Sequence, residues 1–537
     1  MPLQPFDNLA FDDLFVRSLP GDASRTPGSR QVHGAAWSDA PTTPVRAPRL
    51  LAWSDAAGAL LGASPPTDPT GSVALTLGGN QLLRGMRPIA CAYGGHQFGH
   101  WAGQLGDGRA IMLGERATDT GRWEIQLKGA GPTPYSRSAD GRAVLRSSLR
   151  EFVCSEAMFH LGVPTTRALA LVATGQSVIR DMFYDGRPRP EPGAVVTRLA
   201  PTFVRFGNFE LLAARGDRAL LQQLVDFVVR NHYPELAPVL ADAPVAGDHL
   251  LAWFTEIARR TAVMAAHWMR VGFIHGVMNT DNMSVLGLTI DYGPFGWQDI
   301  YDPSFTPNTT DAGQGRYRFG NQPSIAFWNV AMFARALGVL TGGAAFFEPG
   351  LDVFKSTFES TWLAMLRDKL GLDDLGPDHR EADERLISDM DDVMTATELD
   401  MSLWYRVLQK LGPDTTLPEL LRVVSPSFYS ELPETSPVAT RIRVWLSDYV
   451  ARLARNHAPQ AERLARMSAV SPVVIPRNYL LQQAIDAAER GDLAPLAALM
   501  DAIRRPYDDV PANVAFAGKR PEWARDKAGC SALSCSS

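Results

Sequence analysis

Residues 275–293 read HGVMNTDNMSVLGLTIDYG, and this stretch decides which fold the sequence predicts. A strong helical pattern over 248–271 precedes it and ends at Gly272, a residue type that commonly terminates helices. Two short apolar pieces around Gly287 then favour a β-hairpin, which would bring the chain back to a second acidic turn. The stretch therefore predicts a helix, a polar loop, a hairpin and a turn that carries Asp291.

The polar side chains of this stretch suit phosphate chemistry. Phosphoryl and nucleotidyl transfer need a metal ion on the phosphates and an oriented nucleophile. Asn282 and Asp291 could give two oxygen ligands to one Mg²⁺, with phosphate oxygens and water completing the shell. Asp281, beside Asn282, could accept the proton of a hydroxyl. The alternative, a polar turn that caps a hairpin, is disfavoured by the Asp-Tyr-Gly turn that follows.

The loop shares one spacing with protein kinases and departs in another. Their catalytic loop reads His-Arg-Asp, four residues and Asn, so that His and Asn stand seven positions apart, as His275 and Asn282 do here. The position of the kinase base is occupied by Val277, and the loop carboxylate stands at Asp281 instead. Ordinary kinase chemistry therefore does not follow from the spacing.

Upstream, glycine-rich and strand-like segments favour a small α+β lobe. In LGDGR, from Leu105 to Arg109, an Asp-Gly pair between two strand-like runs predicts a hairpin whose tip, with Gly106 and Gly108, could approach phosphates. The run WEIQLKG places Lys128 on the polar face of a strand, and the helix after it carries Glu151. A strand lysine followed by a helix glutamate repeats the ion pair of kinases.

Three further sites could bind phosphate charge. One is the pair Asp140-Gly141 in the basic, glycine-marked run KGAGPTPYSRSADGRAVLRSS. The others are Arg198 and Arg205, which bracket a strand-like stretch, because arginine suits planar, multidentate recognition of phosphate.

The motifs together resemble the selenoprotein O (SelO) family, the kinase-like protein adenylyltransferases. The resemblance covers most of the chain and rests on YGGHQFGHWAGQLGDGRA, WEIQLKGAGPTPYSRSADGRAVLRSSLREF, PTTRAL, PGAVVTRLAPTFVRFGNFE, HGVMNTDNMS, DYGPFGW, GRYRFGNQP and the serine-rich cysteine tail.

The resemblance implies transfer of AMP from ATP to Ser, Thr or Tyr hydroxyls of proteins, including the enzyme itself, with release of pyrophosphate. It implies Asp281 as the proton acceptor, Asn282 and Asp291 as ligands of Mg²⁺ or Mn²⁺, and Glu151 as the residue that positions Lys128. The residues it implies in ATP binding are Gly106, Gly108, Arg109, Lys128, Asp140, Gly141, Arg198, Arg205 and Asp291.

The resemblance also resolves the displaced acid and leaves two departures. Family members carry the loop carboxylate beside the asparagine, where Asp281 stands. Some bacterial relatives have a cysteine after DYGPFG that pairs with a tail cysteine, but Pro307 occupies that place here. The tail, GCSALSCSS, has ordinary Cys535 where some relatives carry selenocysteine. We expect this tail to fray and to leave Cys530 and Cys535 accessible for mixed disulfides. The segment 184–190 looks like an insertion of unassigned role.

Composition narrows the class of protein. With 52 basic and 58 acidic residues the formal charge is −6, so no overall basic field attracts nucleic acid. The first twenty residues lack a basic start and a continuous apolar run, so we expect no secretory signal and a cytoplasmic protein. The apolar stretch 325–347 is interrupted by Asn329 and Arg335 and favours a buried helix over a membrane span.

The predicted architecture is α+β: a protein-kinase-like bilobal fold with an N-terminal extension and a helical C-terminal region. The expected divisions are 1–85 for the extension, 86–212 for the small lobe, 213–380 for the large lobe with the catalytic loop, and 381–537 for the helical region with the cysteine tail. Two alternatives stay open from the residues alone. They are a kinase that transfers the γ-phosphate and a nucleotide-binding pseudokinase scaffold without turnover.

Overall fold

One antiparallel sheet organises the N-terminal part of the molecule. The computed structural model describes residues 2–236 and 243–534. Its eight-stranded sheet runs in the order β1-β3-β6-β7-β10-β9-β2, with β8 paired to β10. The strands are β1 Trp37–Asp39, β2 Arg49–Trp53, β3 Ile89–Cys91, β6 Ala110–Thr118, β7 Gly121–Lys128, β8 Ala143–Val144, β9 Arg167–Arg180 and β10 Arg189–Ala200.

Two small hairpins lie outside that sheet, between it and the helices. One pairs β4 (Gly94–Gln97) with β5 (His100–Gln104), and the other pairs β11 (Phe273–Ile274) with β12 (Gly296–Trp297).

The two faces of the sheet are covered by different segments. Ile125, Leu127 and Leu199 pack in one cluster with Phe6 and Leu9 of the N-terminal segment. Residues of the opposite face pack in a second cluster with α4. Strand β10 contributes side chains to both clusters, since successive residues of a strand point to opposite faces of the sheet.

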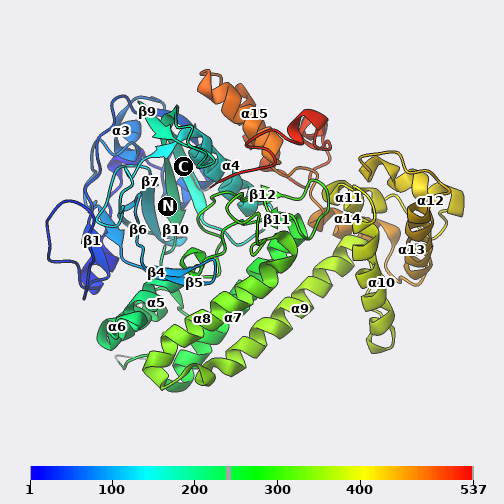
Figure 1. Cartoon of the computed structure of the whole chain (residues 1–537), viewed down its shortest axis with the longest axis horizontal. Coiled ribbons are helices and arrows are strands. Elements are labelled where there is room, and N and C mark those ends of the chain that lie inside the picture. The colour runs from blue at the N-terminus through cyan, green and yellow to red at the C-terminus, as the bar shows by residue number, and fades with distance from the viewer. Residues whose placement is uncertain (1, 237–242, 535–537) are drawn as a thin grey trace.

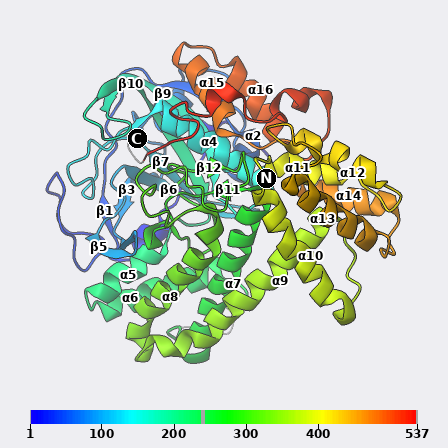
Figure 2. The same cartoon turned by 45° about the vertical axis from the view of Figure 1, so that its right-hand side comes forward.

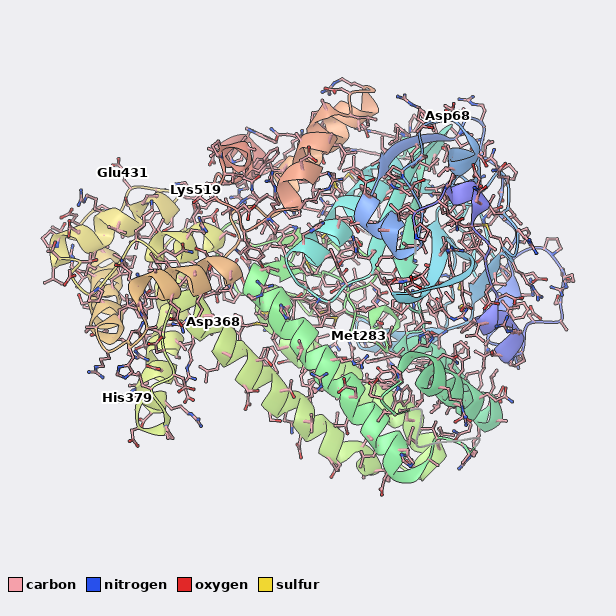
Figure 3. The ribbon with its side chains drawn as sticks, turned by 180° about the vertical axis from the view of Figure 1, so that it is seen from behind. Asp68, Met283, Asp368, His379, Glu431 and Lys519 are labelled. Atoms are coloured by element: carbon pink, nitrogen blue, oxygen red, sulfur yellow. The ribbon has the colours of Figure 1, made fainter. Side chains whose placement is uncertain are left out.

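Helices form most of the rest of the chain (Figures 1 and 2). Short helices accompany the N-terminal segment, α4 lies on the sheet, and α5–α9 pack beside it. The C-terminal group α10–α14 encloses its own apolar cluster, and Figure 3 shows it, with His379 and Glu431, at the opposite end of the molecule from Asp68.

The bounds of the helices are α1 Leu14–Ser18, α2 Asp55–Leu60, α3 Ser72–Leu77, α4 Leu145–His160, α5 Phe206–Ala214, α6 Arg218–His232, α7 Gly247–Val271, α8 Gln322–Thr341, α9 Glu348–Leu370, α10 Pro377–Thr395, α11 Met401–Leu408, α12 Leu417–Val424, α13 Pro437–Leu453, α14 Gln460–Val470, α15 Asn478–Glu489 and α16 Ala494–Ile503.

Among the residues that the structure describes, one helix is long and apolar enough to cross a membrane by length and composition, the segment Phe319–Thr341 that contains α8. Half of its apolar window is buried within the protein, where α8 packs against α5, α7 and α9. Phe333 stacks on Phe206 at 4.4 Å between ring centroids, which is the packing of a core helix.

Two expectations from the sequence are wrong in this part of the structure. The stretch LGDGR does not form a hairpin, because β5 before it pairs with β4, and β6 after it pairs with β3 and β7. The tail does not leave the Cys530 thiol accessible: Cys530 is buried and its backbone carbonyl accepts a hydrogen bond from Asn478. Burial raises the pKa of Cys530 to about 11, which disfavours the thiolate. Cys535 lies outside the described residues.

Candidate functional site

The segment after α7 forms the floor of the candidate site. Gly272 ends α7 in the left-handed conformation and β11 follows. The His275 ring is buried, and its Nε2 lies 2.9 Å from the carbonyl oxygen of Ile290. Burial lowers the pKa of His275, so a neutral ring can donate this hydrogen bond. His275 thereby ties the start of the loop to the residue before Asp291.

The expected hairpin around Gly287 is wrong. Ser284 pairs with Arg205 and Thr289 pairs with Thr165, each as an isolated bridge to a segment outside the loop. The two apolar pieces around Gly287 thus pair with other segments and not with each other. Residues 280–282 form a single turn of 3-10 helix, which carries Asp281 and Asn282.

Asp291 is the centre of a buried charge cluster. Its backbone has a positive φ of 57°, which an aspartate tolerates better than most residues. Its two carboxylate oxygens accept hydrogen bonds from Arg198 and Arg205, and the Lys128 ammonium lies 4.0 Å away. Burial alone would raise the pKa of Asp291, but Arg205, Arg198 and Lys128 outweigh it and hold the pKa well below its usual range. Asp291 is therefore ionised.

The predicted ion pair between Lys128 and Glu151 is present. Lys128 Nζ lies 2.5 Å from Glu151 Oε2, and Arg198 Nη1 lies 3.2 Å from Glu151 Oε1. Burial lowers the pKa of Lys128, while Glu151 opposes that shift. Lys128 and Arg198 are thus held between two carboxylates, Glu151 on α4 and Asp291, in a fixed arrangement.

A cavity of about 710 Å³ opens above this cluster. Most of the residues predicted to take part in nucleotide or metal binding line it: Gly106, Gly108, Arg109, Lys128, Asp140, Gly141, Arg198, Asn282 and Asp291. Glu151, Arg205 and Asp281 are not among its lining residues. Glu151 and Arg205 lie behind it and hold Lys128 and Asp291 in place.

The glycine-rich stretch lines the cavity as a loop that packs on a tyrosine. Gly106 has a φ of 87°, and a Cβ atom there would stand 2.4 Å from the Tyr135 ring. Asp107 is buried and its carboxylate accepts the backbone N–H of Cys91 at 3.0 Å. The Asp-Gly pair thus serves close packing rather than a hairpin.

Asp140 and Gly141 lie at the rim of the cavity. Asp140 forms an ion pair with Arg180 at 2.7 Å, and its carboxylate accepts the backbone N–H of Arg142. A Cβ atom at Gly141 would stand 2.2 Å from the backbone of Gly131, so this close approach requires glycine.

Several lining residues were not predicted from the sequence. They are aromatic or basic, they come from the hairpin β4–β5, the loop after β7 and the hairpin β9–β10, and they include Tyr93, Tyr135, Arg137, Arg142, Arg180 and Tyr184. Tyr184 belongs to the apparent insertion 184–190, whose first residue therefore borders the cavity. Arg137 and Arg142 belong to the basic run that follows Lys128, and that run was the signal in the sequence for this part of the rim.

Asp281 differs from Asp291 in its hydrogen-bond partners and in the direction of its pKa shift. It is buried, its Oδ1 has no hydrogen-bond partner among the described residues, and Gln97 Nε2 lies 3.5 Å from its Oδ2. Gly95 covers it so closely that a Cβ atom there would stand 2.7 Å from Oδ1. Burial raises the pKa of Asp281 to about 7, although Arg205 opposes the shift. A carboxylate with a free oxygen and a pKa near neutrality is suited to accept a proton.

The residues present fit a divalent cation that is shared with phosphate. Within the described residues there is no group of three or more His, Cys, Asp or Glu side chains that could hold a metal ion. Asn282 donates its amide N–H to the Val277 carbonyl at 2.9 Å, which leaves the amide oxygen on the other side. One amide oxygen and the Asp291 carboxylate suit Mg²⁺, which usually keeps waters and takes phosphate oxygens as further ligands.

Comparison with known proteins gives one consistent result. The family model described as protein adenylyltransferase SelO matches residues 34–504. A protein from Aromatoleum aromaticum named protein nucleotidyltransferase YdiU is 53% identical over 536 residues, covering 99% of this chain and 100% of the relative. A protein of the same name from Xanthomonas campestris pv. campestris is 54% identical, covering 99% of this chain and 100% of the relative. Another, from Nitrosospira multiformis, is 52% identical, covering 98% of this chain and 96% of the relative.

Proposed function

Since this chain belongs to the SelO family and is a protein nucleotidyltransferase, we propose that it transfers AMP from ATP to Ser, Thr or Tyr hydroxyls of proteins, itself included. The observation that carries the proposal is the contrast between the two aspartates. Asp291 stays ionised between arginines, and Asp281 keeps a free oxygen and a pKa of about 7. One acid suits charge neutralisation and the other suits proton transfer.

The cavity favours a polyphosphate substrate. Arg109, Lys128 and Arg198 line its inner part, and Arg137, Arg142 and Arg180 line its rim. These six cations outnumber the lining carboxylates Asp107, Asp140, Asp181 and Asp291. Nearby Gly106 and Gly108 permit close approach of the backbone, and the aromatic rings of Tyr93, Tyr135 and Tyr184 offer flat surfaces.

In the proposed reaction the acceptor hydroxyl oxygen forms a bond to the α-phosphorus of ATP and its proton passes to the carboxylate of Asp281. The bond between the α-phosphorus and the oxygen that leads to the β-phosphorus breaks, and pyrophosphate leaves with the electron pair. Mg²⁺ or Mn²⁺, held by Asn282 and Asp291, would neutralise phosphate charge when bound. Lys128 and Arg198, oriented by Glu151, would bind phosphate oxygens.

The same arrangement supports a kinase-like division of the chain, with a small lobe at 86–212 and a large lobe at 213–380. The Lys128–Glu151 pair lies on a strand and a helix of the first part, and Asn282 and Asp291 belong to the second. We further propose the extension 1–85 and the helical region 381–537 as the remaining divisions.

Labelled ATP tests the reaction directly. The enzyme is incubated with Mg²⁺ or Mn²⁺, a mixture of acceptor proteins and ATP labelled at the α- or the γ-phosphate. We expect protein-bound radioactivity from the α-label only, and loss of the signal when the metal is chelated. Incorporation of the γ-label alone would make the enzyme a kinase. ATP binding with neither label incorporated would favour the scaffold.

Glu151→Gln tests the positioning of Lys128. Without the Glu151 charge, burial disfavours the Lys128 ammonium, and Arg198 loses a partner. We expect the Kd for ATP, measured by calorimetry, to rise about tenfold, or about 1.4 kcal/mol. The matched control is Glu191→Gln, which removes the partner of Arg146 on the same helix α4 but does not line the cavity. An equal loss of affinity in both variants would contradict a specific role for Glu151.

A further inference from the structure

Two sequence motifs whose residues, apart from Tyr93, have no part in the proposed nucleotide binding meet beside Asp281. They are YGGHQFGHW at 93–101 and GRYRFGNQP at 315–323. The backbone N–H of Phe98 donates to the Tyr317 hydroxyl at 2.9 Å, and that hydroxyl donates to Asn279 Oδ1 at 2.7 Å. The contact joins the hairpin β4–β5 to the loop that carries Asp281.

The hairpin borders the nucleotide cavity at its base and Asp281 along its length. Tyr93 and Leu105, which flank β4 and β5, line the cavity. Gly95 lies against Asp281 Oδ1, and Gln97 Nε2 is 3.5 Å from Asp281 Oδ2. An acceptor side chain that approaches Asp281 from solvent therefore passes along this hairpin, near its tip and away from Tyr93 and Leu105.

The tip of the hairpin is held in a strained conformation. Phe98 and Gly99 both have positive φ angles, 51° and 85°, in the two-residue turn between Gln97 and His100. Turns of this kind favour Asn-Gly, and a phenylalanine there is costly. The Tyr317 hydroxyl bond and a ring contact of 5.2 Å with Tyr317 hold Phe98 in place. Strain that is fixed by its surroundings is typical of functional sites.

The middle of the hairpin is anchored by a buried network. The backbone N–H of His96 donates to Thr280 Oγ1 at 2.7 Å, and Thr280 donates to Glu210. His96 Nδ1 lies 2.8 Å from the other oxygen of Glu210. Since Thr280 precedes Asp281 directly, the hairpin and the proton acceptor are fixed relative to each other. A surface on this hairpin is therefore rigid before any acceptor arrives.

That surface is a shelf formed by Gly99, Trp101, Arg316 and Trp328, which we call the acceptor shelf. The Arg316 guanidinium lies 4.7 Å over the Trp328 ring, and a Cβ atom at Gly99 would stand 3.3 Å from its Cζ. Trp101 is 41% exposed, which is unusual for so large an apolar side chain. Figure 1 shows β4 and β5 between the large sheet and the helices α5 and α8.

The shelf carries a positive charge on the Arg316 guanidinium. The positive charge of Arg316 opposes the rise that burial causes in the pKa of Asp311, and the buried Nε of Arg316 has no hydrogen-bond partner among the described residues. The nearby carboxylate of Asp311 accepts the backbone N–H groups of Arg316 and Tyr317, and Glu210 is occupied by His96 and Thr280. A planar guanidinium stacked on tryptophan is well suited to bind a carboxylate in two-pronged fashion.

We propose that the acceptor shelf binds an extended segment of the acceptor protein and prefers an acidic residue close to the hydroxyl that is modified. Trp101 covers apolar atoms of the segment, Arg316 binds the carboxylate, and the hydroxyl reaches Asp281 beside Gln97. The inference rests on the proposed adenylylation of protein hydroxyls. It adds the sequence preference of the acceptor.

Short synthetic peptides test this preference. Each peptide carries one Ser or one Tyr, flanked by Glu, Gln or Lys in an otherwise neutral sequence, and AMP transfer is measured with α-labelled ATP. We expect kcat/KM of the unmodified enzyme to be about tenfold higher for the Glu peptide than for the Gln peptide, and lowest for the Lys peptide. Arg316→Glu should reverse the order, and Arg316→Gln should abolish it, with the Kd for ATP unchanged.

The control is Arg335→Glu, an equal change of charge at an exposed position of α8, which should keep the preference for Glu. Equal kcat/KM for the three peptides with the unmodified enzyme would overturn the proposal without any variant. Modification of proteins but of no peptide would also overturn the proposal. A shelf that is rigid and binds a short segment should bind the same segment in a free peptide. If neither proteins nor peptides incorporate the α-label, it is the proposed function that fails.

Discussion

Asp291→Ala is expected to lower metal-dependent nucleotide transfer by about 10³-fold, or about 4 kcal/mol in activation free energy. The substitution removes the ionised oxygen ligand that lines the cavity and leaves Arg198 and Arg205 without their shared partner. We expect ATP to bind in the absence of metal, because Arg198 lines the cavity and is then free to pair with phosphate. The measurement is a rate of α-label transfer beside a calorimetric Kd.

Loss of folding must be distinguished from loss of the metal ligand. Breaking a buried charge network costs roughly 3–5 kcal/mol, so a lower Tm is expected for Asp291→Ala. Asp291→Asn keeps the size and can still accept one hydrogen bond, so it should fold better and lose transfer to a similar degree. Asp248→Ala, at an exposed position in the first turn of α7, is the control. Near-normal transfer by Asp291→Asn and Asp291→Ala would contradict the metal assignment.

Asp281→Asn is expected to slow transfer by about 10²–10⁴-fold, the usual contribution of a general base. With a pKa raised to about 7, Asp281 accepts a proton only when it is deprotonated, that is at higher pH. The kcat/KM of the unmodified enzyme should therefore fall about tenfold for each pH unit below about 7 and level off above it. This acidic limb should be absent from the profile of Asp281→Asn.

ATP affinity separates this effect from a disturbed cavity. Asp281 does not line the cavity, so the Kd for ATP should be unchanged in Asp281→Asn. A variant that binds ATP normally and transfers AMP at an undiminished rate would exclude Asp281 as the proton acceptor. A variant with the slowed rate but the same acidic limb as the unmodified enzyme would assign that limb to another group.

Short-range sequence patterns predicted the parts of the site that depend on spacing along one segment. The helix before Gly272 and the strand that carries Lys128 follow from local periodicity and motif spacing. The pairing of Lys128 with Glu151 followed from the order of strand and helix, together with the kinase precedent. These features need no knowledge of how distant segments pack.

The failures all depend on distant partners. The Asp-Gly pair at 107–108 looked like a hairpin turn, but Tyr135 and Cys91 from other segments decide its conformation. Cys530 looked exposed because its neighbours are small and polar, yet Asn478 binds its carbonyl in the interior. Helix α9 was not predicted, since its apolar residues are shared between α7 and the C-terminal helices.

The order of strands in the large sheet has a consequence for synthesis of the chain. Both edge strands, β1 and β2, come from the first sixty residues, but β2 pairs with β9, which ends at Arg180. During translation β1 can pair with β3 soon after Cys91 is made, but β2 ends at Trp53 and waits for β9, which begins at Arg167. At ordinary rates of synthesis that wait lasts roughly ten seconds. Strand β2, which forms one edge of the sheet, is therefore synthesised long before the strand that it pairs with.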